Sequence, residues 1–189
     1  DIHEMIALNL RIMVETGRDI RHVRKDLEQL SGKFTELEEL FALYREESRY
    51  KPRRRFQQAR QLVVLRHMVT LCEEGLDTLW LLEKHQDILQ ANETAQILID
   101  EELHELASFQ ERVFLKFAGK MNPSPHDHEA FTYEQSMRPV QKALRTFKDD
   151  EELLMHLLPS ILQLHSYREK LEEIDQTIEH YFHSQPSQS

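Results

Sequence analysis

Glycine, proline and cysteine are all scarce in this chain, and each scarcity excludes a class of structure. Four glycines and six prolines punctuate 189 residues, and the β-branched residues are too scattered to form strands. Such a composition favours long helices joined by short turns. The single cysteine, Cys72, excludes an intramolecular disulfide and fits a reducing compartment. We therefore predict an all-α protein in which Cys72 is a small buried hydrophobe rather than a catalytic thiol.

The chain also lacks a long hydrophobic run and an excess of positive charge. Its longest apolar runs, such as residues 62–65, are far shorter than the roughly 20 residues that span a bilayer. The net charge of −10 argues against nucleic acid as a partner, because binding a polyanion depends on neutralising its phosphates. A Gly-rich phosphate loop, a Gly-x-Ser-x-Gly elbow and an HExxH motif are all missing. We expect no catalytic residues, no cofactor and no bound metal, and so a protein that is not an enzyme.

An apolar stripe opens the chain and predicts a first helix over residues 2–30, ended by Ser31 and Gly32. Because the stripe is already running at the first residues, without a capping residue, we expect the chain to continue from a preceding segment. We interpret the stripe as part of the core. Because two polar positions in it can set the register between paired helices, a homodimer through this helix is the alternative. The stripe alternates steps of three and four: Ile6, Asn9, Met13, Thr16, Ile20, Val23, Leu27 and Leu30.

Further stripes predict four or five more helices. A second helix begins near Phe34 and stops at Lys51-Pro52, because proline disfavours helical geometry in the residue before it. A third begins at Arg53 and packs on more than one neighbour, with Gly75 as a point where it bends or divides. Asn92 is the expected cap of the fourth helix, which ends at Gly119.

The last third of the chain predicts a loop and two helices. The loop is residues 121–128, MNPSPHDH, whose prolines a helix could not continue through. The next helix carries Tyr133, Met137, Val140, Leu144 and Phe147 on its inner side. Asp149 is the expected cap of the final helix, which Pro159 either kinks or begins. The sequence therefore predicts one elongated antiparallel bundle of five or six helices over residues 1–183, with long first and last helices. A disordered polar tail follows over residues 184–189.

Two carboxylate–histidine pairs and one loop raise the possibility of a metal site. Glu101 with His104 and Asp19 with His22 have the i, i+3 spacing of a di-iron bundle, which needs two Glu-x-x-His motifs aimed inward. The loop adds His126 and His128, a pair that needs two further ligands to hold zinc. Both helical pairs lie among exposed charges and the loop has no nearby cysteine. We therefore interpret these side chains as solvated, with a carboxylate and histidine metal-binding bundle as the alternative.

A basic segment is the main exception to the acidic composition. Eight arginines and lysines stand against two glutamates over residues 45–66, which leaves about −16 for the rest of the chain. Three interpretations are open: a solvated face, contact with anionic lipid, or recognition of a carboxylate or phosphate by the planar fork of arginine. Arg49, Arg53 and Arg60 are the candidate contacts for a ligand or an anionic surface. Arg53 and Arg60 lie two turns apart and share a helix face.

The same segment carries a family resemblance. YREESRY at residues 44–50, RRRFQQARQ at 53–61 and the apolar continuation over 62–68 resemble the C-terminal cytoplasmic domain of the aromatic acid exporter family of Gram-positive membrane proteins. The resemblance implies transmembrane helices upstream in the same protein, and a helical domain that hangs on the cytoplasmic side of the cell membrane. It implies a regulatory or assembly role in a transporter. A free-standing helical adaptor that binds a partner protein is the alternative.

Overall fold

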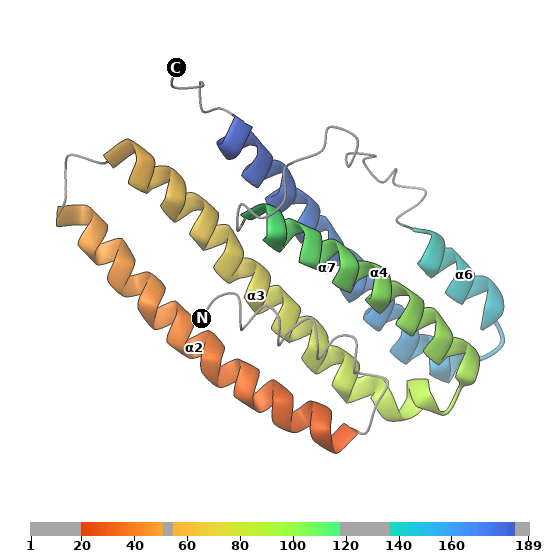
Figure 1. The fold of residues 1–189 in the computed structure, drawn as a ribbon. Helices are drawn as coiled ribbons and strands as arrows, with labels where there is room; N and C mark the ends of the chain where they lie inside the picture. The colour runs from red at the N-terminus through yellow and green to blue at the C-terminus, as the bar shows by residue number, and fades with distance from the viewer. Residues whose placement is uncertain (1–19, 51–54, 118–136, 184–189) are drawn as a thin grey trace.

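Five helices make up the part of the chain that the computed structural model describes, which is residues 20–50, 55–117 and 137–183 (Figure 1). No strand occurs within these ranges. The prediction of an all-α bundle is therefore confirmed. The helices are α2 (Ile20–Tyr50), α3 (Arg55–Gln90), α4 (Glu93–Phe117), α6 (Arg138–Thr146) and α7 (Glu151–His183).

Helices α3 and α7 form the middle of the bundle. α3 packs against α2, α4 and α7, and α7 packs against α3, α4 and α6. α2 lies along the outer side of α3, and α6 lies at the opposite edge of the molecule (Figure 1). As predicted, α3 contacts several neighbours. It also runs unbroken through Gly75, so that glycine does not divide it.

The pairing of α3 with α7 is antiparallel, as side chains that meet across it show. Thr78 on α3 accepts a hydrogen bond from Gln163, and His85, two turns further along α3, meets Ser160 of α7. Between these polar contacts, Leu79 and Leu82 of α3 and Ile161 of α7 are aliphatic and buried. Burial of such side chains is the main favourable contribution to folding. Those with essentially no exposure include Leu27, Leu71, Leu79, Leu157, Leu171 and Ile178.

The predicted break at Ser31 and Gly32 is wrong, because α2 continues through both residues to Tyr50. The apolar stripe stays in phase across the glycine: Leu30 and Leu37 are buried, and Phe34 packs against the core between them. Ser31 also donates its hydroxyl to the carbonyl of Leu27 at 3.0 Å, one turn back in the same helix. Packing of the stripe outweighs the cost of a glycine in a helix, about 1 kcal/mol. The end of α2 just before Lys51-Pro52 agrees with the prediction.

The two predicted helix caps have different outcomes. Asn92 caps α4 as expected, since its Oδ1 accepts a hydrogen bond from the backbone N–H of Ala95 at 3.1 Å. The predicted cap of the final helix, Asp149, is wrong by one residue. Asp150 takes that role and accepts the backbone N–H of Leu153 at 3.0 Å. The backbone N–H of Asp150 bonds to Phe147, which sets the turn between α6 and α7 and places residue 150 just before the helix.

The inner side of α6 differs from the prediction at one position. Val140, Ala143 and Phe147 are buried, whereas Leu144, which the stripe placed inside, is 45% exposed. The buried positions follow steps of three and then four, so Ala143 occupies the place expected for Leu144. Pro159 is exposed and lies inside α7, which starts at Glu151, so the alternative that this proline begins the helix is wrong.

Several predictions fall outside the described residues. They are the helix over residues 2–19, the loop over 121–128, the helix end at Gly119, the place of Tyr133 on the next helix, and the tail over 184–189. The assignment of residues 1–183 to one domain stays a prediction. None of the described helices combines the length and the low charge that crossing a bilayer requires.

Candidate functional site

The predicted contact residues Arg49, Arg53 and Arg60 are not brought together by anything the structure describes. Arg53 lies outside the described residues, and the side chains of Arg49 in α2 and Arg60 in α3 also lie outside them. The basic segment is described only near its two ends, where Arg45 and Arg66 are exposed. The role of the three candidate residues stays a prediction.

The residues considered for a metal site are also dispersed. Glu101 is exposed and pairs with Lys142 at 3.1 Å, and His104 is exposed. Asp19, His126 and His128 lie outside the described residues. Within the described ranges, no three histidine, cysteine, aspartate or glutamate side chains are placed together to hold a metal ion.

A layer of polar side chains crosses the interface between α3 and α7. Nδ1 of His85 lies 3.2 Å from Oγ of Ser160, and the rings of His85 and His156 meet edge to face with centroids 5.0 Å apart. Ser160 donates its hydroxyl to the backbone carbonyl of His156 at 2.8 Å. Burial, followed by the charge on His156, lowers the pKa of His85. The layer therefore favours the neutral form of His85.

This layer contains a hydroxyl next to an imidazole, as a nucleophilic site does, but it lacks the rest of the arrangement that such a site needs. Nucleophilic catalysis needs an accessible hydroxyl and a base that a third group orients. Ser160 has no exposed surface, and the ring that meets His85 is another imidazole rather than a carboxylate. Cys72 offers no better nucleophile, since burial raises the pKa of its thiol to about 12. These groups act in packing and in setting the register of α3 against α7.

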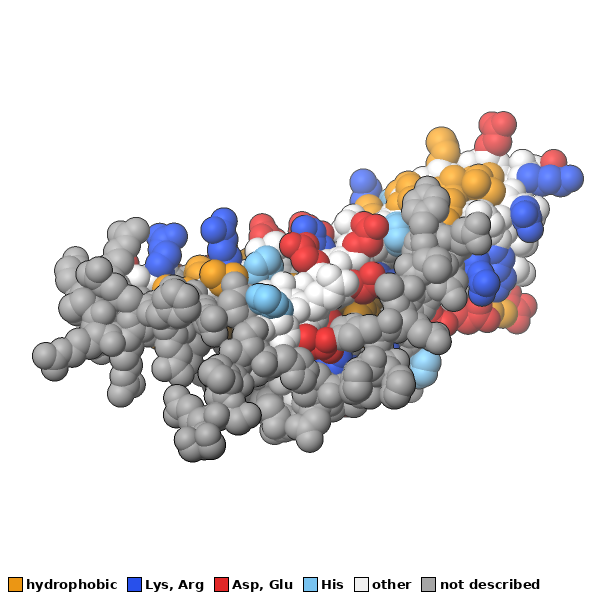
Figure 2. Space-filling view, turned by 90° about the horizontal axis from the view of Figure 1, so that it is seen from above, with side chains coloured by type: hydrophobic (Ala, Val, Ile, Leu, Met, Phe, Trp, Pro, Cys, Tyr) orange, Lys and Arg blue, Asp and Glu red, His pale blue; other side chains and the backbone are white. Residues whose placement is uncertain are grey.

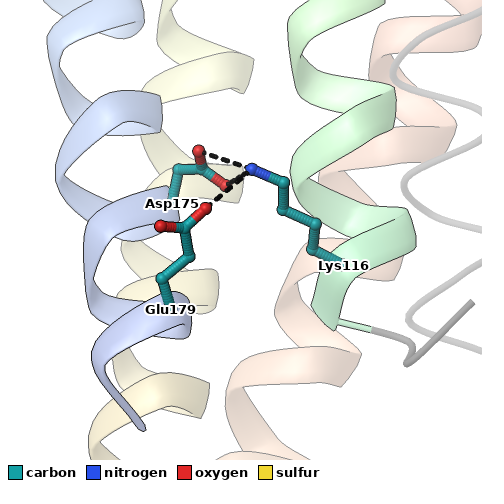
Figure 3. A network of polar contacts seen from close by, with 3 residues as sticks. All are labelled: Lys116, Asp175 and Glu179. Atoms are coloured by element: carbon teal, nitrogen blue, oxygen red, sulfur yellow. Dashed lines mark hydrogen bonds and ion pairs between the residues drawn. The ribbon is translucent and has the colours of Figure 1, made fainter. Parts of the chain in front are cut away.

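Lys116 forms a buried ion-pair network with two carboxylates of α7 (Figure 3). Its Nζ lies 3.0 Å from both carboxylate oxygens of Asp175 and 3.0 Å from Oε1 of Glu179. The side chains of Lys116 and Asp175 are 3% and 6% exposed. Burial alone would lower the pKa of Lys116, but the hydrogen bonds and charges of the two carboxylates outweigh burial and raise it. The network fixes the end of α4 to α7.

A second link between α4 and α7 is neutral. The hydroxyl of Tyr167, which has no exposed surface, donates to Oε1 of Gln110 at 2.9 Å. A buried tyrosine hydroxyl needs such a partner, because an unpaired polar group in the core is costly. One turn of α4 thus pairs with one turn of α7 in a fixed register. Sequence reasoning singled out neither Gln110 nor Lys116.

A cleft of about 500 Å³ opens where α6 lies against α4 and α7. Its α6 wall carries the cations Arg138, Lys142 and Arg145, and Arg168 of α7 adds a fourth. The opposite wall is acidic and is formed by three glutamates of α4. Leu98 and Pro139 add apolar surface to the lining, and the glutamates are Glu101, Glu102 and Glu105.

Ion pairs join the two walls of the cleft. Arg168, with 10% of its side chain exposed, lies 3.0 Å from a carboxylate oxygen of Glu105 and 3.6 Å from one of Glu102. Lys142 spans the cleft to Glu101 in a pair that is well exposed on both sides. Burial raises the pKa of Glu102, the charge of Arg168 opposes that shift, and the charges of Glu105 and Glu101 add to it.

The cleft was missed in the sequence, although a signal for half of it was present. Arg138, Lys142 and Arg145 follow the i, i+4, i+7 spacing of one helix face. That spacing indicates a basic face but does not say what lies opposite. Elsewhere the surface is mixed: Figure 2 shows acidic and basic side chains interspersed over the described part of one face, with hydrophobic side chains gathered at the end where Figure 1 places α6.

Comparison with known proteins gives one relative. The chain is similar to the UPF0421 protein YgaE of Bacillus subtilis (strain 168), with 29% identity over 182 residues. The match covers 93% of this chain but 50% of the relative, so the chain spans half of that protein's length. The name of this relative assigns it no activity. No family profile matches the chain, and no solved structure matches it either.

Proposed function

We propose that the chain is a non-enzymatic helical domain of a membrane transporter, held on the cytoplasmic side of the membrane, where it regulates or assembles the permease. The proposal rests chiefly on how much of the relative YgaE this chain matches. Nearly all of this chain matches YgaE, yet half of YgaE lies outside the match. A bundle of this kind therefore occurs in a longer protein, next to as much sequence again.

The transporter context comes from the resemblance of residues 44–68 to the aromatic acid exporter family. In that family the helical domain accompanies transmembrane helices of the same chain. The partners that we propose are those upstream helices, a second copy through residues 2–30, and anionic lipid through the basic segment. Arg49, Arg53 and Arg60 are the residues that we assign to anionic contact.

The absence of catalysis is part of the proposal. Among the described side chains, the groups closest to a reactive arrangement are His85 and Ser160, which are sealed between α3 and α7. A site that no substrate can reach supports a structural role. The long, buried stripes of α3 and α7 instead suit a rigid body that transmits force or position between helices.

An efflux assay in the native host tests this proposal. Cells that carry the whole gene, cells without it, and cells with residues 20–183 deleted in frame are loaded with a labelled aromatic carboxylate. We expect less efflux from cells without the gene than from cells with the whole gene. Cells in which only the bundle is deleted should show the same low efflux as cells without the gene. Equal efflux with and without the gene would contradict the exporter assignment. Full efflux from the bundle deletion would contradict the regulatory or assembly role.

A free-standing adaptor is the second candidate, and the surface of α2 is the observation in its favour. Leu40 and Leu43 are 56% and 61% exposed on a helix that packs chiefly on α3. Exposed aliphatic side chains one turn apart suit a protein-binding face. An adaptor would be recovered with soluble proteins after cell lysis, whereas a transporter domain would be recovered with the membranes.

A further inference from the structure

We propose that the cleft between α4, α6 and α7 binds a small organic monocarboxylate, whose carboxylate is held by Arg138 and Arg145. This inference goes beyond the proposed function and does not depend on membrane attachment. It starts from how the charges in the cleft are paired. Each glutamate of the acidic wall already has a cation: Glu101 has Lys142, and Glu102 and Glu105 share Arg168.

After this pairing, two guanidinium groups of the cleft lining remain, those of Arg138 and Arg145. No carboxylate within the described ranges forms an ion pair with Arg138 or Arg145, although both side chains line the cleft and are exposed. They lie seven residues apart on one face of α6, a separation of about 10 Å along the helix axis. Long arginine side chains can converge over such a distance. The planar fork of each guanidinium matches the two oxygens of a carboxylate.

The position of α6 keeps this basic face turned into the cleft. Val140 and Ala143 are buried on its other side. Rotation of the helix would therefore expose apolar surface, which is unfavourable. The arginines are held at the cleft before any ligand arrives, and such preorganisation reduces the entropic cost of binding.

The charge of the lining selects the ligand. Four cationic side chains face three carboxylates, an excess of one positive charge. A ligand with one negative charge balances this excess, while a polyanion would be repelled by the acidic wall.

The size and the apolar lining point to a small organic body on the ligand. The cleft volume of about 500 Å³ lies within the range typical of small-molecule sites, about 300–1,000 Å³. Leu98 and Pro139 are the apolar residues of the lining, and both are largely buried. A ligand with a carboxylate and a short branched or cyclic hydrocarbon group therefore matches both the arginines and the apolar part of the lining.

Calorimetric titration of the full chain with isovalerate tests the proposal, and the neutral isostere isovaleramide and the trianion citrate serve as comparisons. We expect saturable binding of isovalerate, no binding of isovaleramide, and weaker binding of citrate. Arg138→Gln and Arg145→Gln should each weaken isovalerate about tenfold or more, the effect of losing a charge-assisted hydrogen bond. Glu105→Gln should strengthen it several-fold, because that change removes one negative charge from the acidic wall of the cleft.

Arg66→Gln is the matched control, since Arg66 is exposed on α3 and does not line the cleft. It should leave isovalerate binding unchanged, and all variants should keep the helical circular dichroism of the parent chain. The proposal is overturned if isovalerate gives no saturable heat, if citrate binds more tightly than isovalerate, or if Arg66→Gln weakens binding as much as Arg138→Gln does.

Discussion

Replacing Lys116 by methionine would remove the cation from the buried network while keeping most of the side-chain volume. Asp175 and Glu179 would then keep their charges beside α4 without the ammonium group that lies 3.0 Å from each of them. Breaking a buried ion pair by removing one partner costs about 3–5 kcal/mol, because an uncompensated charge is left behind. We therefore expect Lys116→Met to lower the free energy of unfolding by about 3–5 kcal/mol.

Chemical and thermal unfolding followed by circular dichroism measure this effect. For a chain of this size, each kcal/mol corresponds to about 2–4 °C in Tm, so Tm should fall by roughly 10 °C. Lys170→Met is the matched control on α7, where Lys170 pairs with Glu173 at 3.6 Å and the two side chains are 42% and 55% exposed. An exposed pair contributes about 0–1 kcal/mol, so this variant should change stability little.

A triple variant distinguishes loss of charge balance from loss of packing. Lys116→Met combined with Asp175→Asn and Glu179→Gln leaves no buried charge in the network, so much of the lost stability should return. The reasoning is refuted if Lys116→Met unfolds no more easily than Lys170→Met. It is also refuted if neutralising both carboxylates deepens the loss instead of relieving it.

Three further changes have defined outcomes. His85 has a lowered pKa in the folded protein, so the unfolded chain binds more protons below pH 6.5. The free energy of unfolding should therefore fall on acidification. His85→Gln should flatten that part of the curve of stability against pH, as measured by urea unfolding. Asp150→Ala should destabilise by about 1 kcal/mol in the same assay, because it removes the cap of α7, while Asp149→Ala should be close to neutral. Gly32→Ala should raise stability by about 0.5–1 kcal/mol, since a Cβ there meets no atom within 4 Å; a lower Tm would show that α2 is not a continuous helix.

The fold class follows from the sequence because it depends on periodicity, which is local. The stripe in α4 identifies Leu98, Leu103 and Leu106 as inner residues, and all three are buried. The cap at Asn92 and the stop before Pro52 also depend only on neighbouring residues. The cap and the stop are each complete within about one turn of helix, and the stripe within a few turns.

The errors arise where two local signals compete. At Ser31 and Gly32 a glycine suggests a cap, but the stripe through Leu30, Phe34 and Leu37 continues in phase and packing decides the outcome. At the start of α7 two adjacent aspartates are both competent caps. Only the bond between Asp150 and Phe147, made in the turn, determines which one serves.

The cleft could not be predicted because its parts are distant in sequence. Glu105 and Arg168 are 63 residues apart, and they meet only because α4 and α7 pack together. The basic face of α6 could be recognised from spacing alone, but the acidic wall opposite it depends on tertiary placement. Lys116, Asp175 and Glu179 were missed for the same reason.

Recovery of the natural full-length protein after an alkaline carbonate wash of host membranes tests most directly whether this bundle belongs to a membrane transporter. Such a wash strips peripheral proteins and leaves integral ones in the pellet. We predict that the protein stays in the pellet and that a tag within the bundle is digested by protease only when the inner face of the membrane is open. Release of the whole protein into the wash would contradict the account.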